Sequence, residues 1–492
     1  MSLILSQLPT FLLIAANYIL VLAIMWRLIL REDLQPPTRL AWIMVVALVP
    51  ALGSIAYVLI GEVRLHRTEK QKLRDIETGL GIAWGPIRLP AHTEPAIAPS
   101  FALGRALSGF PPVLGNRAVM LPEDDSCFDD MIATIDAAQD HVHLLFYIWM
   151  PDTTGTRMAE AAIRAAARGV TVRVLVDDLG SRRLVRSPLW REMQEAGVAC
   201  ARAEPIGNPF TRLVYKRLDL RNHRKIIVVD NVVTWTGSRN CADAAFQTKA
   251  KFAPWVDILI RVEGPVVRQF QAVFLRDWML HSDEDVTHLL ADAPEAVPAT
   301  ADADRPAHIL PFKGQVLASG PDQMTSGMSE TICALLYAAQ DSVTITTPYF
   351  LPDQAVQAAI CACARRGVMT VLILPEHNDS RLIGAASEGF YHALVEAGVQ
   401  LRAFRHGLLH SKIITVDGQF GMIGSANLDR RSFDLNYECN LLFHSTALTT
   451  ELDRRQGSYL ARSRPISAQE VAGWSVARRV YTNALSLAGP LL

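Results

Sequence analysis

The sequence predicts an α/β protein of two similar halves that follow an N-terminal membrane hairpin. Three observations lead to this prediction. Charged side chains within the first 61 residues are confined to one short segment, and two regions about 200 residues apart align with each other. In both regions, helical patterns alternate with β-branched apolar strands. At 492 residues, the chain is long enough for more than one hydrophobic core.

Two uncharged runs at the N-terminus, residues 1–26 and 40–61, can each cross a hydrocarbon layer as a helix, which takes about 20 residues. The polar segment between them contains Pro36 and Pro37. We therefore expect a membrane hairpin over residues 1–61, with helices at about 8–30 and 40–61. A cleaved signal peptide fits poorly, because the chain start lacks basic residues and the apolar run is too long. Two buried core helices are the alternative interpretation.

Basic residues beside the hairpin indicate its orientation. Three arginines lie at its turn, whereas five basic residues follow its second helix: Arg64, Arg67, Lys70, Lys72 and Arg74. These five belong to residues 62–114, which we expect to form a juxtamembrane linker. The larger count on the side of the main body predicts a multi-pass protein of the cell (inner) membrane with a cytoplasmic body. The seven scattered cysteines, interpreted as core thiols in a reducing compartment, agree with this orientation.

Composition argues against several classes of function. The formal net charge is −1, which disfavours a protein that binds nucleic acid through its overall field, so no nucleic-acid partner is expected. Cys361 and Cys363 are separated by one residue, which is not a zinc-binding spacing. Carboxylates do not cluster at metal-ligand spacing either. We therefore expect no metal and no other cofactor.

The main body contains a duplication. AAQDHVHLLFYIWMPD at residues 137–152 aligns without gaps to AAQDSVTITTPYFLPD at 338–353. Downstream, AARGVTVRVLV at 166–176 matches ARRGVMTVLIL at 364–374, and the letters EAGV occur once in each copy. The order of predicted helices and strands is the same in both copies. The sequence therefore predicts the same α/β unit twice.

The duplication divides the body into two halves, which we place at residues 115–290 and 307–492. The stretch 291–306 between them is rich in Ala, Pro and Asp, and we expect a linker there. Beyond Ser467, apolar residues recur on one helical face: Val471, Trp474, Ala477, Tyr481 and Leu485. We interpret this face as part of a terminal helix packed on the body. A helix lying on the membrane surface is the alternative.

The most informative repeat lies within residues 217–244 and 404–431. The first copy reads NHRKIIVVDNVVTWTGSRN and the second HSKIITVDGQFGMIGSAN. Both hold six residue types at the same spacings: His223, Lys225, Asp230, Gly237, Ser238 and Asn240, and then His410, Lys412, Asp417, Gly424, Ser425 and Asn427. Chance matching of both copies is negligible. If one copy had lost its function, mutations would have replaced some of its six motif residues. Both copies keep all six, so both are expected to be functional.

Strand geometry separates the members of each motif. Alternate side chains of a strand share a face, so His223 and Lys225 point together. Asp230, five residues after Lys225, faces the other way, and the second copy has the same parity. Each His–Lys pair is therefore expected to belong to a site, whereas each Asp supports the scaffold from behind, next to a hairpin turn.

Two such motifs brought face to face would form a phosphate site. The lysines, together with Ser238, Asn240, Ser425 and Asn427, would neutralise and hydrogen-bond the non-bridging oxygens. One imidazole could attack phosphorus and form a phospho-histidine. The other would protonate the departing alkoxide and then deprotonate an incoming alcohol or water. Histidine suits both steps, because its ordinary pKa of about 6.5 lies near the working pH.

Two acids are candidates for orienting the imidazoles. Asp257 and Glu438 each lie downstream of a Gly-Ser-x-Asn segment, close to an aromatic residue and at the start of an apolar strand. We predict that they hydrogen-bond the histidines and fix their tautomers. For Asp257, the alternative is an ordinary carboxylate at a strand end.

These motifs resemble the phospholipase D superfamily, whose signature is H-x-K-x4-D followed by G-S-x-N. The resemblance covers the chain from about residue 115 to its end. More narrowly, DLRNHRKIIVVDN, LLHSKIITVDG and GSANLDRRSFDLNYE are similar to the bacterial cardiolipin synthases, as is the N-terminal hairpin. The resemblance implies two pseudo-symmetric phospholipase D-like α/β sandwich domains with one active site between them. It also implies phosphatidyl transfer between two phosphatidylglycerol molecules, giving cardiolipin and glycerol, with membrane phospholipid and the bilayer as partners.

Rival functions make different predictions. A hydrolytic phospholipase D would use the same residues, whereas a membrane-tethered nuclease is disfavoured by the absence of a basic body. A non-enzymatic lipid-binding protein would have no need for both motifs. By superfamily analogy, His223 is the nucleophile and His410 the general acid/base, although the near-symmetry of the halves permits the reverse. The sequence does not set the oligomeric state.

Overall fold

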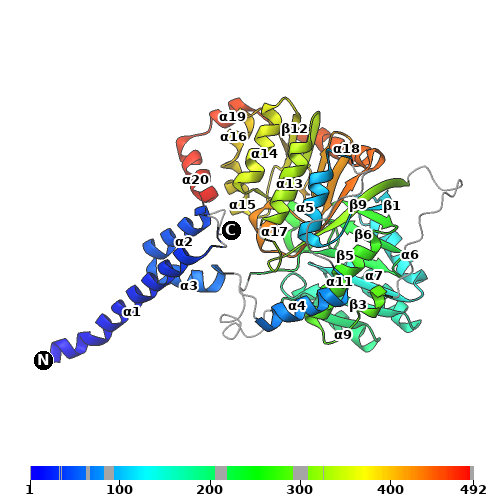
Figure 1. Ribbon diagram of the computed structural model, residues 1–492, viewed down its shortest axis with the longest axis horizontal. Coiled ribbons are helices and arrows are strands. Elements are labelled where there is room, and N and C mark those ends of the chain that lie inside the picture. The colour runs from blue at the N-terminus through cyan, green and yellow to red at the C-terminus, as the bar shows by residue number, and fades with distance from the viewer. Residues whose placement is uncertain are drawn as a thin grey trace.

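The two halves of the chain share one continuous β-sheet (Figure 1). The computed structural model describes residues 2–32, 34, 36–62, 67–82, 94–205, 219–291, 309–324 and 326–487. Within these residues, the sheet has 15 strands in the order β19-β13-β12-β10-β15-β16-β18-β9-β1-β8-β6-β5-β2-β3-β4. The halves meet at its centre, where β1 pairs antiparallel with β9.

Equivalent strands follow one another outward from this central pair. The first half contributes β1 (Val113–Met120), β2 (His141–Phe146), β3 (Thr171–Asp177), β4 (Ala199–Ala203), β5 (Lys225–Val229), β6 (Val233–Gly237) and β8 (Leu259–Glu263). The second half contributes β9 (Leu310–Ser319), β10 (Ser342–Thr346), β12 (Met369–Pro375), β13 (Gln400–Phe404), β15 (Ile413–Val416), β16 (Phe420–Gly424), β18 (Glu438–His444) and β19 (Ser463–Ile466). This order confirms the predicted pair of pseudo-symmetric α/β units.

Helices cover both faces of the sheet, so most strands are buried on two sides. One face carries α6 (Cys127–Ala137), α7 (Thr153–Ala167), α9 (Pro188–Glu195), α13 (Gly327–Ala338), α14 (Gln354–Arg365) and α16 (Tyr391–Glu396). The other face carries α11 (Val267–His281) and α18 (Thr446–Ala461), which share one core that extends across both halves. This shared core fixes the halves relative to each other.

The shorter elements complete the fold. They are α8 (Arg182–Val185), α12 (His288–Ala291), α15 (Arg381–Glu388), α17 (Arg430–Asp434), α19 (Ala468–Ala472), α20 (Val476–Leu487), the 3₁₀ helix η1 (Gln247–Phe252), β7 (Trp255–Val256), β11 (Phe350–Leu351), β14 (Leu408–Leu409) and β17 (Leu428–Asp429).

Repeated sequence letters cap equivalent helices. Asp152 and Asp353, at the end of the repeated Pro-Asp dipeptide, precede α7 and α14. Their carboxylates accept hydrogen bonds of 3.0 and 2.8 Å from backbone N–H groups in the first turn. After these helices, Gly169 and Gly367 have φ values of 89° and 88°, where a side chain would be strained. The duplication therefore extends to the helix ends.

The N-terminal segment differs from the prediction in its second helix. Helix α1 (Ser2–Leu30) includes Phe11–Leu30, 20 residues that are long and apolar enough to span a membrane. The expected second helix is divided into α2 (Pro36–Leu48) and α3 (Pro50–Ile60), because Pro50 has no N–H and its ring clashes with the preceding turn. Among the described residues, α1 is the one helix long and apolar enough to span a membrane, so the second predicted span stays a prediction.

Helices α2 and α3 form a V beside the C-terminal half of α1. Gly53 packs so closely on α2 that a Cβ there would lie 2.5 Å from a backbone carbonyl oxygen. Arg39, at the start of α2, donates to the Arg31 carbonyl, and Arg27 Nε donates to Oε1 of Glu62, just after α3, at 2.5 Å. The start of α2 and the end of α3 therefore both lie at the C-terminal end of α1. The N-terminal end of α1 points away from the body (Figure 1).

The predicted juxtamembrane linker contains two helices that pack on the body. Helix α4 (Arg67–Gly79) contacts α11 of the first half, whereas α5 (Ala98–Ser108) contacts α13 and β9 of the second half. Apolar residues of both helices are buried, among them Ile76 and Phe101. The segment is therefore also part of the folded core. Residues 292–306 of the predicted linker between the halves lie outside the described residues.

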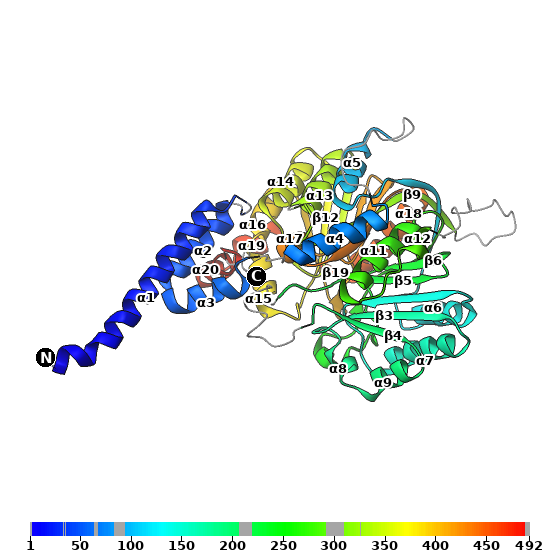
Figure 2. The ribbon, with the colours of Figure 1, turned by 60° about the horizontal axis from the view of Figure 1, so that its bottom comes forward.

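Only part of the predicted C-terminal apolar face is packed. Val471 and Trp474 are buried, but Tyr481 is exposed, as are Val476 and Val480. The helix α20 contacts α15. Figures 1 and 2 both place α20 next to α2, so the terminal helix lies beside the N-terminal apolar helices.

Candidate active site

Two equivalent hairpins carry the repeated motif. Strands β5 and β6 pair antiparallel, as do β15 and β16, and Asp230 and Asp417 occupy the turns with a φ of 52° each. Their carboxylates accept hydrogen bonds of 2.8–2.9 Å from backbone N–H groups at the starts of β2 and β10. Both aspartates therefore fasten the hairpins to neighbouring strands. The structure places them on the scaffold and away from the pocket.

Each histidine-bearing segment pairs with the other half of the chain. The short strand β14 lies parallel to β7, and the His410 N–H donates to the Val256 carbonyl at 2.8 Å. In the equivalent contact, the His223 N–H donates to the Tyr437 carbonyl at 2.9 Å. This exchange of backbone hydrogen bonds brings each histidine next to the acid of the opposite half.

The two predicted acids bind the histidines crosswise. His223 Nδ1 lies 2.9 and 3.0 Å from the carboxylate oxygens of Glu438, and His410 Nδ1 lies 2.6 Å from Oδ1 of Asp257. A carboxylate at Nδ1 fixes that nitrogen as the N–H donor and leaves Nε2 free for chemistry. The structure therefore places both acids where they can orient the imidazoles.

Burial sets the charge of these pairs. It lowers the pKa of His223 and of His410 to about 4, although the neighbouring carboxylates act in the opposite direction. Burial alone would raise the pKa of Asp257, but the charge and hydrogen bond of His410 hold it below its ordinary value. The same balance with His223 lowers the pKa of Glu438. Near neutral pH, the unliganded site thus holds neutral imidazoles beside ionised carboxylates.

The two motif lysines lie buried next to the histidines. Lys225 Nζ donates to the His223 carbonyl and Lys412 Nζ to the His410 carbonyl, at 2.6 Å each. Burial lowers the pKa of Lys225 to about 8 and that of Lys412 to about 7. An anion bound between the halves would favour the charged form of both lysines.

The two motif serines differ from the prediction. Ser238 Oγ donates to Asp257 and Ser425 Oγ to Glu438, at 2.5 Å each. Both hydroxyls also accept a backbone N–H, so their hydrogen-bonding capacity is largely used. The predicted phosphate-binding role does not fit this position, because each serine hydroxyl is bound to one of the two acids and neither serine lines the pocket. Sequence spacing could not distinguish these two arrangements.

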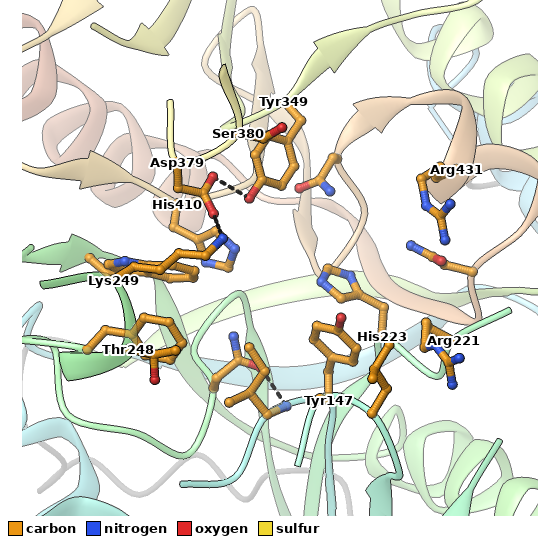
Figure 3. A pocket seen from close by; sticks show the side chains of 18 of the residues that line it. Tyr147, Arg221, His223, Thr248, Lys249, Tyr349, Asp379, Ser380, His410 and Arg431 are labelled. Carbon is orange, nitrogen blue, oxygen red and sulfur yellow. Dashed lines mark hydrogen bonds and ion pairs between the residues drawn. The ribbon is translucent and has the colours of Figure 1, made fainter. Parts of the chain in front are cut away.

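One pocket of about 490 Å³ brings the two halves together. Its lining includes four of the predicted residues, His223, His410, Asn240 and Asn427. Figure 3 shows both imidazoles at this pocket. Asn240 Oδ1 accepts the Ile148 N–H at 3.2 Å, which leaves its amide N–H groups for a ligand. Within the described part of the chain, no group of three or more His, Cys, Asp or Glu side chains could hold a metal ion.

Aromatic residues beside the histidines were missed in the sequence. The Tyr147 ring lies 4.8 Å from that of His223, and the Trp255 ring lies 4.7 Å from that of His410, centroid to centroid. The Phe246 ring contacts that of Trp255 in a tilted arrangement, with 4.3 Å between the ring centroids. Tyr147 lies within the repeated segment 137–152, but it aligns there with Pro348, so the repeat alignment carried no signal for this residue. These rings limit the access of water to the imidazoles.

An ion pair also joins the halves across the pocket. Lys249 of η1 pairs with Asp379 in the loop after β12, and the Tyr349 hydroxyl donates to Asp379 at 2.7 Å. Figure 3 shows this group on the same side of the pocket as His410, whereas Arg221 and Arg431 flank His223. The two sides of the pocket thus differ although the motifs repeat.

Comparison with known proteins agrees with this geometry. The family described as "Cardiolipin synthase, PLD-like domain" matches residues 131–278 and 332–457, and "Phospholipase_D-nuclease N-terminal" matches residues 19–62. The chain is 32% identical over 488 residues to cardiolipin synthase A of Edwardsiella ictaluri, covering 97% of each chain. It is 33% identical over 447 residues to cardiolipin synthase A of Yersinia pseudotuberculosis, covering 88% of this chain and 89% of the relative. A phosphatidylserine synthase structure from Haemophilus influenzae Rd KW20 shares the fold, with a TM-score of 0.58 and 15% identity over 80% of this chain and 100% of that one.

Proposed function

This chain belongs to the cardiolipin synthase family with phospholipase D-like domains, and from this we propose that it transfers a phosphatidyl group between two phosphatidylglycerol molecules, giving cardiolipin and glycerol. The observation that carries the proposal is the shared pocket. His223 and His410 come from different halves, line the same pocket and each present Nε2 with Nδ1 held by a carboxylate.

The proposed first step forms a phospho-histidine. The neutral Nε2 of one imidazole attacks the donor phosphorus, and the bond from phosphorus to the headgroup glycerol oxygen breaks. The other imidazole, protonated in the complex with the anionic substrate, gives its proton to that oxygen, and glycerol leaves. The lysine ammoniums and the amides of Asn240 and Asn427 support this step by stabilising charge on the non-bridging oxygens.

In the proposed second step, a hydroxyl of the acceptor phosphatidylglycerol attacks the same phosphorus. Its proton passes to the imidazole that served as the acid, and the phosphorus–nitrogen bond breaks. Cardiolipin is released and both imidazoles return to their starting states. Superfamily analogy makes His223 the nucleophile and His410 the acid/base. Water in place of the acceptor would give phosphatidic acid, the product of a hydrolytic phospholipase D.

We also propose a membrane arrangement. Helix α1 spans the bilayer, and the α2–α3 V enters it from the side of the body without crossing it. This arrangement is supported by the contacts of Arg27 and Arg39, which hold both ends of the V at one end of α1. The basic residues of α4, including Lys70 and Lys72, favour a cytoplasmic body at the inner membrane. The pocket would then lie close to donor and acceptor lipids at high local concentration.

Expression in a bacterial host that lacks cardiolipin tests the proposed activity. Lipid mass spectrometry should detect cardiolipin in cells with the wild-type chain and none with His223→Ala or His410→Ala. Accumulation of phosphatidic acid without cardiolipin would show hydrolysis instead. Cleavage of oligonucleotides without any lipid turnover would favour the nuclease alternative.

A further inference from the structure

Two cations at the mouth of the pocket are not neutralised by carboxylates. Arg182 and Arg183 on α8 line the pocket and are exposed. Arg183 donates to the hydroxyl of Thr248 at 3.1 Å, and Thr248 is uncharged. Within the part of the chain that the structure describes, neither guanidinium forms an ion pair with a carboxylate. A pocket mouth with uncompensated positive charge favours an anionic ligand.

The arginines beside His223 are different. Arg431 pairs with Asp219, at 3.1 Å from Nη1 to Oδ2, and Nη1 of Arg221 lies 3.9 Å from Oδ2 of Asp177. Lys249 is likewise paired, with Asp379. The excess positive charge of the pocket lining is therefore located at α8.

The hydrogen bond from Arg183 to Thr248 places α8 next to η1, on the side of His410. Figure 3 shows Thr248 and Lys249 on that side. Trp255 and Phe246 form an aromatic wall between η1 and the His410 ring. A ligand whose anionic group lies at Arg182 and Arg183 therefore extends along this wall toward His410.

We propose that Arg182 and Arg183 form a second phosphate subsite, which holds the phosphodiester of the acceptor lipid while its free hydroxyl reaches His410. This inference rests on the proposed function and specifies its acceptor. An acceptor phosphatidylglycerol carries its own phosphate one glycerol unit away from the reacting hydroxyl. Arginine pairs well with such a group, because its guanidinium presents several N–H donors in one plane. Free glycerol has no phosphate and gains nothing from this subsite.

The subsite acts on selectivity. Once the phospho-enzyme has formed, water, glycerol and lipid hydroxyls all compete for it. Binding of the acceptor phosphate raises the occupancy of the lipid hydroxyl next to His410 and thereby favours cardiolipin over hydrolysis. A zwitterionic acceptor would bring its own positive charge toward the two arginines and is expected to bind less well.

One assay with two acceptors tests the subsite. Purified full-length protein is supplied with phosphatidylglycerol vesicles and labelled free glycerol. Cardiolipin formation and the incorporation of labelled glycerol into phosphatidylglycerol are then measured together. In the double variant Arg182→Gln/Arg183→Gln, we expect the ratio of cardiolipin formation to glycerol exchange to fall about 10-fold or more, through a higher KM for the acceptor lipid.

Arg186→Gln is the control, since it makes the same Arg→Gln change, with loss of one positive charge, at an exposed position just after α8 that does not line the pocket. Its ratio should equal that of the wild type. The proposal is overturned if the double variant keeps the wild-type ratio, or if both of its reactions fall by the same factor. Failure of the proposed function would appear separately, because the wild-type protein would then form phosphatidic acid and no cardiolipin.

Discussion

His223 in the first half binds Glu438 in the second half, with 2.9 Å between Nδ1 and Oε2. The reciprocal pair joins His410 to Asp257 at 2.6 Å. Backbone hydrogen bonds from His223 and His410 to the opposite halves hold this exchange in place. Neither half can therefore orient its own histidine, and the two motifs form one site through mutual dependence.

The acid partners provide the first prediction. Glu438→Gln and Asp257→Asn should each lower kcat by about two to four orders of magnitude, because the amide no longer fixes the tautomer of the facing imidazole. Glu438→Gln should also lower the pKa of His223 further, since the carboxylate favours its protonated form. The measurement is the pH–rate profile. Glu396→Gln, at an exposed position, is the control, and wild-type kcat in Glu438→Gln would contradict the prediction.

Trapping of the phospho-enzyme should distinguish the roles of the two histidines. With a phosphatidyl donor whose leaving group needs no protonation, His410→Ala should accumulate a phospho-enzyme at His223, because the attacking imidazole remains. His223→Ala should accumulate none. Acid-quenched protein analysed by mass spectrometry gives the position of the phosphate. Phosphate found at His410 in the His223→Ala variant would reverse the assigned roles.

Ligand binding should be coupled to proton uptake. In the unliganded site, burial holds the pKa of each imidazole at about 4, so both are largely neutral at pH 6. A bound anion favours the imidazolium form and raises these pKa values, and protons must then enter the site. The lysines, with pKa values of about 8 and 7, are already mostly protonated at this pH.

Calorimetric titration of inorganic phosphate at pH 6, in two buffers of different ionisation enthalpy, measures this uptake. The heat of binding should depend on the buffer with the sign of proton uptake. The double variant His223→Gln/His410→Gln should lose that dependence. Identical heats in both buffers for the wild-type protein would contradict the pKa argument.

The membrane arrangement predicts that the two ends of the hairpin segment lie on opposite sides of the bilayer. In a cysteine-free background, Ser6→Cys should react with an impermeant maleimide added outside intact cells, whereas Gln71→Cys should react only after the cells are opened. Two complete spans would instead place both cysteines on one side. Cells treated with a permeant maleimide serve as the control for reactivity.

The sequence predicts the repeat and the contributing motifs because they consist of local patterns. Strand parity separates His223 from Asp230, and the recurring Gly and Asp letters mark turns and caps. The crosswise pairing of histidines and acids was not predictable, because it depends on how two halves pack. The position of the two motif serines was not predictable either. A serine that binds phosphate and a serine that hydrogen-bonds a carboxylate can occupy the same place in the motif, so the sequence spacing is the same for both. Pro50 is visible in the sequence, but the prediction of one continuous second helix rested on the apolar character of residues 40–61 and did not include the break that a proline causes.

The central claim is that both imidazoles serve one phosphorus atom, and the products of each single-histidine variant test it most directly. Purified protein with headgroup-labelled phosphatidylglycerol in EDTA should form one cardiolipin for each glycerol released. His223→Ala and His410→Ala should each form none, and mixing the two variants should not restore activity in monomeric preparations. About half of the wild-type rate in either variant would contradict the central claim, whereas phosphatidic acid as the only lipid product would contradict the proposed transfer between lipids.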